Sequence, residues 1–246
     1  MQPLRLLVNG ARGRMGRAII GCASTDSAVI VSGESESDDE LLAALPRCDA
    51  VIEFTHADVT ARVLERCVEA KKILVIGTTG QSEAVREQIA DAGKIIPIVF
   101  APNYSVGVNT LFWLTRKAAE ILGPEFDLEI LEMHHRLKKD SPSGTARGLA
   151  EILTDVRNLQ YASDVRHGRE GMVGERTPTE IGMHAIRGGD VVGDHTVIFA
   201  NVGERVELTH KASSRDTFAK GSIHAAKWAA AQPAGLYNMQ HVLGLE

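Results

Sequence analysis

The first hundred residues alternate short apolar runs with helix-like stretches, and this alternation restricts the fold more than any other feature of the chain. Strands separated by helices pair in parallel, through right-handed crossovers. We therefore predict an α/β domain with a parallel sheet and helices on both faces. The apolar runs of strand length occupy residues 4–9, 28–34, 50–54, 72–77 and 94–100.

A glycine-rich turn, "VNGARGRMG", follows the first predicted strand and opens a helix expected over residues 14–23. Glycines in such a turn let the backbone approach a pyrophosphate, and the helix N-terminus attracts the anion. An ordinary strand-to-helix turn is the alternative, but the context favours a Rossmann-type dinucleotide site. The candidate cofactor residues of this turn are Gly10, Arg12, Gly13, Arg14, Met15 and Gly16.

An acidic residue ends the second predicted strand. Glu34 follows Gly16 by 18 residues, where a carboxylate can accept hydrogen bonds from the adenosine ribose. A carboxylate repels a 2′-phosphate, and residues 35–40 contain no cation to offset it, so NADH is the favoured cofactor. Arg12 and Arg14 could still reach a phosphate, which leaves NADPH open.

The ends of the fourth and fifth strands supply further candidates, because ligands bind at the carboxyl ends of parallel strands. Turn formation and contact with the nicotinamide half of the cofactor are equally good interpretations of these segments. The residues concerned are Gly77, Thr78 and Thr79 after the fourth strand, and Ala101, Pro102, Asn103 and Tyr104 after the fifth.

The pattern changes after residue 103, where helices and strands no longer alternate regularly. We expect helices over 106–122 and 144–155, and strands over 127–135, 181–187, 191–200 and 205–211, joined partly by the tight turns "RGGD" and "NVGE". The second half is therefore predicted as an α+β unit with a mostly antiparallel, mixed sheet. A last helix over 216–231 completes the chain.

The segment "EMHHRLKKDSPSGTA" concentrates proton carriers and cations at a predicted strand end. Adjacent strand residues face opposite ways, so His134 and His135 cannot share one task. One interpretation is a strand end with one buried and one solvated histidine. A metal site is another, but no ligand spacing supports it, and we predict no metal.

The third interpretation is a proton-donating site for a small acidic substrate. A histidine donates protons near neutral pH, and Lys138 can supply a cation. Ser141 or Ser143 can cap the helix that follows, whose N-terminus binds carboxylates. Spacing alone does not decide which histidine donates.

The chain resembles the 4-hydroxy-tetrahydrodipicolinate reductase (dihydrodipicolinate reductase) family of lysine and diaminopimelate biosynthesis. The resemblance runs from one end of the chain to the other, and its most specific part is HH-x-x-K-x-D-x-PSGTA. The other matching pieces include "GARGRMG", "IEFTHADVT", "VIGTTG", "APNYSVGVN", "GERTPTEIGMHAIRGGDVVGDHTVIFANVGERVELTHKASSRDTFAKG" and "GLYNMQHVL".

This resemblance implies reduction of 4-hydroxy-tetrahydrodipicolinate to tetrahydrodipicolinate with loss of water, using NADH or NADPH. It implies a dinucleotide-binding domain of residues 1–103 and 216–246, a substrate-binding and oligomerisation domain of residues 104–215, and a homotetramer. Many NADPH-competent members carry arginine where this chain has Ser35. The roles implied are proton donation by His134 with Lys138 as its cationic partner, and binding of a small dicarboxylate by His135, Ser143, Gly144 and Thr145.

Composition limits the other classes of function. A net charge of −5 and a pI near 6.0 argue against a nucleic-acid-binding or anionic-membrane surface. Three cysteines without CxxC spacing indicate a reduced, cytoplasmic protein, and no apolar run is long enough for a membrane span. An amino-acid dehydrogenase and a non-catalytic dinucleotide sensor are the rival hypotheses, and neither needs the HH-x-x-K…PSGT segment.

Overall fold

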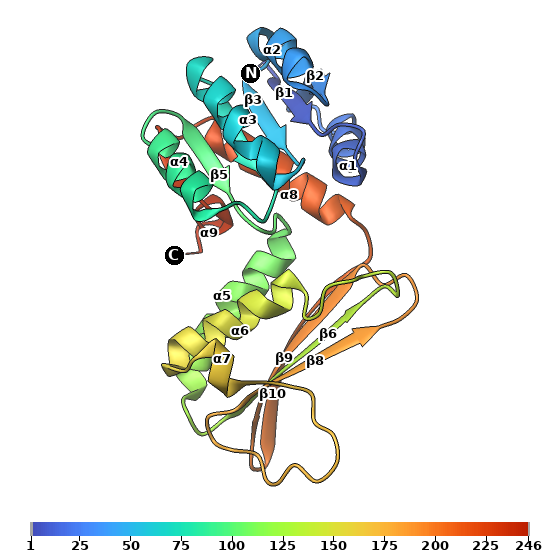
Figure 1. The fold of residues 1–246 in the computed structure, drawn as a ribbon, viewed down its shortest axis with the longest axis vertical. Helices are drawn as coiled ribbons and strands as arrows, with labels where there is room; N and C mark the ends of the chain where they lie inside the picture. The colour runs from blue at the N-terminus through green and yellow to red at the C-terminus, as the bar shows by residue number, and fades with distance from the viewer. Residues whose placement is uncertain (1, 246) are drawn as a thin grey trace. The chain divides into compact units, whose positions relative to one another are not determined.

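A parallel sheet forms the core of the N-terminal part of the computed structural model, which describes residues 2–245 (Figure 1). Its strands lie in the order β11-β5-β4-β3-β1-β2, and every ladder between them is parallel. The α/β architecture is therefore confirmed. The strands are β1 (Leu4–Asn9), β2 (Val29–Ser35), β3 (Ala50–Glu53), β4 (Ile73–Ile76), β5 (Pro97–Phe100) and β11 (Gly235–Tyr237).

Helices cover both faces of this sheet because successive strand residues point to opposite sides. Leu6 and Val8 of β1 belong to one hydrophobic core, and Leu7 belongs to the other. The first core packs against α1 (Arg14–Ala23), α8 (Asp216–Ala229) and α9 (Met239–Leu243). The second packs against α2 (Asp38–Ala44), the short 3-10 helix η1 (Leu45–Arg47), α3 (Ala57–Glu69) and α4 (Glu83–Gly93).

A β-bulge in β2 shifts the residues that follow it. The partner of Leu6 is Val31, but the partner of Leu7 is Gly33, so β2 carries one extra residue at this point. The strand ends at Ser35, whose hydroxyl donates to the side-chain oxygen of Asn9 over 2.7 Å. The bulge therefore shifts the later residues of β2 by one position relative to β1.

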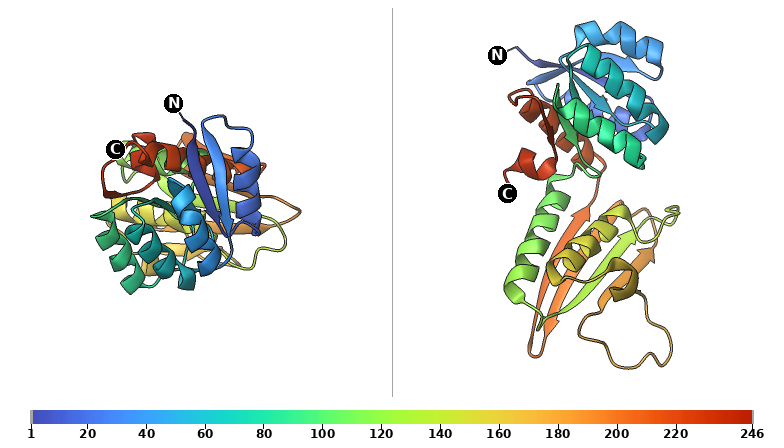
Figure 2. Two further views of the ribbon diagram at one scale, coloured as in Figure 1. Left: turned by 90° about the horizontal axis from the view of Figure 1, so that it is seen from above. Right: turned by 60° about the vertical axis from the view of Figure 1, so that its left-hand side comes forward.

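A second, mixed sheet lies in the middle part of the chain, in the order β10-β9-β6-β8-β7. Its β6–β8 and β7–β8 ladders are parallel, and its β6–β9 and β9–β10 ladders are antiparallel. Figure 2 shows the helices α5 and α6 against one face of it. The elements are α5 (Val106–Leu122), β6 (Asp127–His134), α6 (Gly144–Arg157), α7 (Tyr161–Asp164), β7 (Val165–His167), β8 (Ile181–Arg187), β9 (Gly193–Asn201) and β10 (Glu204–Ala212).

One of the two expected antiparallel connections does not join paired strands. The turn "NVGE" joins the paired strands β9 and β10, with Gly203 at φ +86°. The turn "RGGD" follows β8, but β8 and β9 are not neighbours, because β6 lies between them. The consecutive strands β8 and β9 therefore flank β6 instead of forming a hairpin.

The described chain divides into two compact units. The first contains the residues up to Val106 and those from Arg215 onward, and the second contains Gly107–Ser214. The expected boundaries were 103/104 and 215/216. We call these the N-terminal-sheet unit and the mixed-sheet unit.

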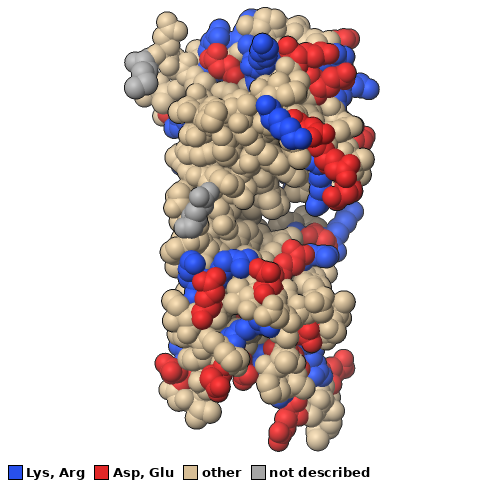
Figure 3. Space-filling view, turned by 90° about the vertical axis from the view of Figure 1, so that its left-hand side faces the viewer, with Lys and Arg blue, Asp and Glu red and all other residues tan. Residues whose placement is uncertain are grey.

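Figure 3 shows acidic and basic side chains intermixed on the face turned to the viewer, without a large patch of one sign. Among residues 2–245, no helix combines the length and the apolar character that a membrane crossing requires. The same residues contain no group of three or more His, Cys, Asp or Glu side chains arranged to hold a metal ion.

Candidate active site

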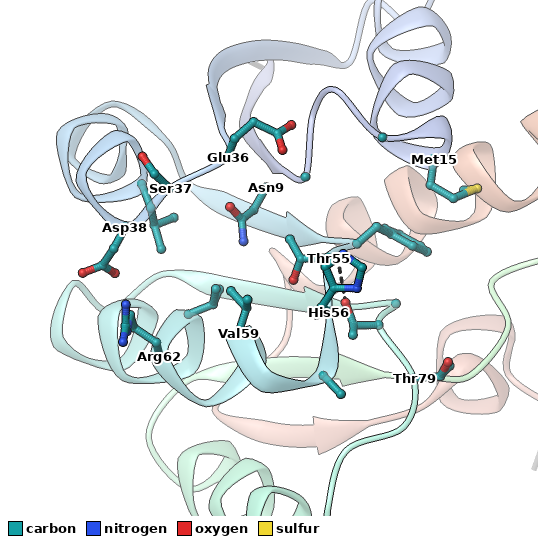
Figure 4. Close-up of a pocket in the computed structure, with 18 of the residues that line it drawn as sticks. Asn9, Met15, Glu36, Ser37, Asp38, Thr55, His56, Val59, Arg62 and Thr79 are labelled. Atoms are coloured by element: carbon teal, nitrogen blue, oxygen red, sulfur yellow. Dashed lines mark hydrogen bonds between the residues drawn. The ribbon is translucent and has the colours of Figure 1, made fainter.

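A cavity of about 890 Å³ lies at the carboxyl ends of β1, β3 and β4, within the N-terminal-sheet unit (Figure 4). Seven of the predicted cofactor residues line it, namely Gly10, Gly13, Arg14, Met15, Gly77, Thr78 and Thr79. The glycine turn and the fourth-strand end, which are far apart in the sequence, are therefore brought together as expected for the edge of a parallel sheet.

The glycine turn is shaped for close approach of the backbone. Gly10 has φ +84°, and a Cβ added to it would collide with the carbonyl oxygen of Phe54. Gly13 is the N-cap of α1 and no side chain caps this helix start. The first N–H groups of a helix have no partner inside the helix, so the uncapped start faces the cavity as an anion-binding feature.

The acidic residue at the cavity is Glu36, not Glu34. Glu36 lines the cavity and accepts a hydrogen bond from the backbone N–H of Arg12, whereas Glu34 is exposed on β2 and lies outside the cavity wall. Because β2 carries one extra residue at the bulge and continues to Ser35, Glu34 pairs with Val8 inside the ladder. Glu36 is the first residue after the strand.

The two ends of the cavity differ chemically. Figure 4 shows Asp38 and Arg62 at one end, and Met15 and Thr79 at the other. Glu36 lies between them and next to the glycine turn, to which the N–H of Arg12 binds it. Sequence reasoning missed Asp38 and Arg62, as well as Asn9, whose buried Nδ2 has no hydrogen-bond partner in the described structure.

Several predicted cofactor residues do not line this cavity: Arg12, Gly16, Ala101, Pro102, Asn103 and Tyr104. Gly16 instead allows α1 to pack on the turn, since a Cβ there would collide with Gly10 and Ala11. The Tyr104 side chain is buried in the core, and its hydroxyl lies 2.8 Å from the carbonyl oxygens of Ile76 and Val99. The ring of Tyr104 therefore supports β4 and β5 and does not face this cavity.

A buried carboxylate supports the cavity wall from behind. Glu53, at the end of β3, is fully buried and accepts hydrogen bonds from the hydroxyls of Thr55 and Thr78, the latter over 2.6 Å. Burial raises the pKa of Glu53 above its usual value. Both threonines line the cavity, so Glu53 fixes the orientation of two wall residues.

The mixed-sheet unit carries a separate cluster around the end of β6. The alternation of β6 places Glu132 and His134 on the helix-covered face, and both are buried. The Nδ1 atom of His134 lies 2.7 Å from Oε2 of Glu132. His134 thus ends the strand with one ring nitrogen held by a carboxylate.

Glu132 joins three parts of the unit. Arg187 of β8 binds both of its oxygens at 2.8 Å, and the backbone N–H of Ser143 donates to Oε1 over 3.0 Å. Burial acts to raise the pKa of Glu132, but the hydrogen bonds from a histidine, an arginine and a backbone amide outweigh it and lower the pKa to about 2. Glu132 is therefore ionised at neutral pH.

Ser143 begins α6 in the way the sequence predicted. Its hydroxyl caps the helix by accepting from the N–H of Ala146 over 3.2 Å, and it also lies 3.0 Å from Nε2 of His195 on β9. Burial is the main cause that lowers the pKa of His195, to about 3, so this ring is neutral. A Cβ on Gly144 would meet nothing within 4 Å, so the helix start opens onto space.

Of the remaining predicted residues, Thr145 lies in the first turn of α6, and Lys138 and His135 lie in the loop between β6 and α6. Lys138 forms an ion pair with Asp140 over 2.9 Å, and its side chain is 20% exposed. His135 lies just beyond the strand, and its backbone N–H donates to the carbonyl of Val191 over 2.8 Å. His134 and His135 thus occupy different environments, as strand geometry predicted.

Sequence reasoning did not find Glu132, Arg187 or His195 as site residues. For Glu132 a signal existed, because strand alternation places it on the same face as His134. Arg187 and His195 come from β8 and β9, the two neighbours of β6, and only the strand order of the mixed sheet brings them to this point.

Two family models cover nearly the whole chain. The model "Dihydrodipicolinate reductase, N-terminus" matches residues 4–104, and "Dihydrodipicolinate reductase, C-terminus" matches residues 107–243. The chain belongs to the dihydrodipicolinate reductase family. The predicted resemblance is thereby confirmed over both halves of the chain.

Relatives of this family match over the full length. A 4-hydroxy-tetrahydrodipicolinate reductase of Akkermansia muciniphila is 56% identical over 242 residues, covering 98% of each chain. One of Geotalea uraniireducens is 44% identical over 265 residues, covering 98% of this chain and 99% of the relative.

Solved structures share the fold. The dipicolinate-bound dihydrodipicolinate reductase from Paenisporosarcina sp. TG-14 superposes with a TM-score of 0.78 at 22% identity, covering 96% of this chain and 97% of that one. A probable dehydrogenase from Thermotoga maritima gives a TM-score of 0.62 at 13% identity, covering 98% and 93%. The fold is therefore shared with both of these solved structures.

Proposed function

We propose that this protein reduces 4-hydroxy-tetrahydrodipicolinate to tetrahydrodipicolinate, with loss of water, in lysine and diaminopimelate biosynthesis. The observation that carries the proposal is the buried His134–Glu132 pair beside the open space at Gly144, in a chain of this reductase family. The overall change consumes one reduced nicotinamide cofactor and one proton, and it releases one water molecule.

The cavity of the N-terminal-sheet unit fits a nicotinamide dinucleotide. Its volume lies within the usual range for ligand sites. The collision that a side chain at Gly10 would cause, and the uncapped start of α1, match the demands of a pyrophosphate. The bound cofactor supplies the hydride. Gly10, Gly13 and Arg14 would hold the pyrophosphate, and Thr78 and Thr79 would contact the nicotinamide half.

We propose NADH as the preferred cofactor and NADPH as a secondary one. Glu36 and Asp38 both line the cavity, and their carboxylates suit ribose hydroxyls and repel a 2′-phosphate. Arg62 lies at the same end as Asp38 and offsets part of this repulsion, which supports residual use of NADPH.

The dicarboxylate substrate would be held and protonated by the mixed-sheet unit. The start of α6 at Ser143, Gly144 and Thr145 offers a helix N-terminus to one carboxylate, with Lys138 and His135 as further polar groups. His134 would give its proton to the substrate carbon next to the one that accepts the hydride. Each carries a role that the family resemblance implies.

A coupled assay tests the reaction. The substrate is formed in place from pyruvate and aspartate semialdehyde, and oxidation of NADH is followed by absorbance. We expect oxidation that depends on both precursors. Oxidation without them would favour a different dehydrogenase, and cofactor binding without any turnover would favour a dinucleotide sensor.

The variant His134→Gln separates the two sites in the same assay. We expect kcat to fall by roughly 100-fold, as for the loss of a general acid, while the Kd of NADH stays unchanged. A change confined to the Kd of NADH would reject the role given to His134.

We further propose that the protein is a cytoplasmic homotetramer assembled through the mixed sheet. The three cysteines are free and buried, which supports a reducing compartment. On the sheet face opposite α5 and α6, Leu131 and Ile186 are exposed by 36% and 43%. Light scattering coupled to gel filtration should give four times the mass of one chain, and the mass of a single chain would reject this assembly.

A further inference from the structure

Glu132 is fully buried, and both of its carboxylate oxygens accept hydrogen bonds. One of its oxygens binds Nδ1 of His134 and Nη1 of Arg187, and the other binds Nη2 of Arg187 and the amide of Ser143. These partners come from the end of β6, the end of β8 and the start of α6. One side chain therefore connects the proposed proton donor to the proposed carboxylate cradle.

The cost of burying this charge is met by a matched cation. A buried carboxylate is costly unless it is paired and hydrogen-bonded. Arg187 binds both oxygens in a bidentate pair and also donates to the carbonyl of Asp140 over 2.7 Å, so it is itself fixed at the loop that carries Lys138. A structural ion pair would need nothing more than these contacts, and it would not need a histidine on the same oxygen.

The contact with His134 assigns different tasks to the two ring nitrogens. An ionised carboxylate only accepts hydrogen bonds, so the 2.7 Å contact requires a proton on Nδ1. Nε2 is then the nitrogen that can gain and lose a proton. It lies against the backbone of β9 at Gly193, where an added Cβ would come within 2.9 Å of it. Glycine at this position leaves room for the His134 ring.

We propose that Glu132, held by Arg187, is a positioning residue that keeps Nδ1 of His134 protonated, so that Nε2 is the atom from which the substrate receives its proton. This inference rests on the proposed reaction and deepens it. Because the same carboxylate holds the amide of Ser143, it also sets the donor at a fixed position relative to the start of α6.

His195 cannot take over this role. Its ring lies 5.1 Å from that of His134 between centroids, but no hydrogen bond joins them among the described contacts, and its Nε2 faces Ser143. A neutral ring on β9 leaves Glu132 as the group that orients His134.

The first test observes the protonation of the His134 ring in the unaltered protein. Nitrogen-15 NMR of the imidazole groups in the free protein distinguishes the tautomers, after assignment of the His134 signals with His134→Gln. We expect neutral His134 to carry its proton on Nδ1. A proton on Nε2 alone would overturn the proposal, whatever the activity of the protein.

The second test compares Glu132→Gln with Glu129→Gln. Glu129 also lies on β6, and it also binds arginines and a histidine, but it belongs to the opposite face of the sheet. We expect Glu132→Gln to lower kcat roughly 10- to 100-fold, as for other histidines oriented by a carboxylate, with unchanged Kd for NADH and a mixture of His134 tautomers. Glu132→Asp should recover part of the loss, because it keeps the charge.

The control should retain the kcat and the His134 signals of the unaltered protein. Equal kcat in Glu132→Gln and Glu129→Gln would overturn the positioning role. Lack of turnover in the unaltered protein would instead reject the proposed function, while the tautomer measurement would still test the contact between Glu132 and His134.

Discussion

At the scale of single residues, the proposed preference for NADH rests on the charge beyond β2. Glu36 is exposed at the cavity, and its only described hydrogen-bond donor is the backbone of Arg12, so its second oxygen can face a ribose. Hydrogen bonds to a charged group contribute about 1.5–3 kcal/mol, which corresponds to at least about tenfold in affinity.

The variant Glu36→Ala tests this account. We expect the Kd of NADH to rise about tenfold and that of NADPH to stay constant or fall, because the variant removes an acceptor for one cofactor and a repulsive charge for the other. Fluorescence titration with both cofactors measures the ratio, and Glu34→Ala is the matched control. Equal weakening of both cofactors would contradict the role of Glu36.

Single residues also mark where sequence reasoning reached its limit. Ser141 or Ser143 was predicted as a helix cap from local chemistry alone, and the hydroxyl of Ser143 forms the contact. Glu34 was chosen by its spacing from Gly16 and its place at the strand end, but β2 carries an extra residue opposite Leu6 and Leu7 and continues to Ser35. Arg187 reaches Glu132 from the neighbouring strand β8, and nothing in its local sequence indicates that contact.

At the scale of elements, β6 carries on each of its two faces a glutamate that binds arginine and histidine side chains. Glu132 faces the helices, whereas Glu129 faces the long segment between β7 and β8, where Arg169 and Arg176 bind it at 2.6 and 3.1 Å. Burial acts to raise the pKa of Glu129, but hydrogen bonds from two arginines and a histidine outweigh it and lower the pKa to about 2.

This shift predicts a loss of stability in acid. A carboxylate whose pKa is lower in the folded state stabilises the fold above its unfolded pKa, near 4.3, and that contribution disappears as pH falls towards 2. The shift corresponds to roughly 3 kcal/mol at neutral pH. Glu129→Gln should therefore reduce the free energy of unfolding at pH 7 and much less at pH 2.5.

Urea titrations of both proteins across this pH range provide the measurement. A difference in unfolding free energy that stays constant between pH 7 and pH 2.5 would contradict the lowered pKa of Glu129. Arg116→Ala, which breaks an exposed ion pair with Asp155, should change stability by less than about 1 kcal/mol.

The elements themselves were largely predictable where one signal dominated. The helices at Arg14–Ala23 and Val106–Leu122 begin and end where periodicity placed them. The helix α2 was not predicted, although Ser37 and Glu40 have capping spacing. The order of strands in the mixed sheet was not predictable, since pairing between β6, β8 and β9 depends on contacts far apart in the sequence.

At the scale of the whole molecule, the two units divide the proposed chemistry. The N-terminal-sheet unit offers a glycine turn, an uncapped helix start and acidic side chains, which suit a nicotinamide dinucleotide. The mixed-sheet unit offers an oriented histidine and a capped helix start, which suit a dicarboxylate and a proton. Hydride and proton would therefore come from different units of one chain.

Transfer of a labelled hydride tests the proposed reaction most directly. The coupled assay is run with NADH that carries deuterium at the transferred position of the nicotinamide. The mass of the product is then measured by mass spectrometry. We predict tetrahydrodipicolinate with one deuterium per molecule and one equivalent of NAD⁺. Oxidation of NADH with an unlabelled product, or a labelled product that retains the hydroxyl group, would contradict the account.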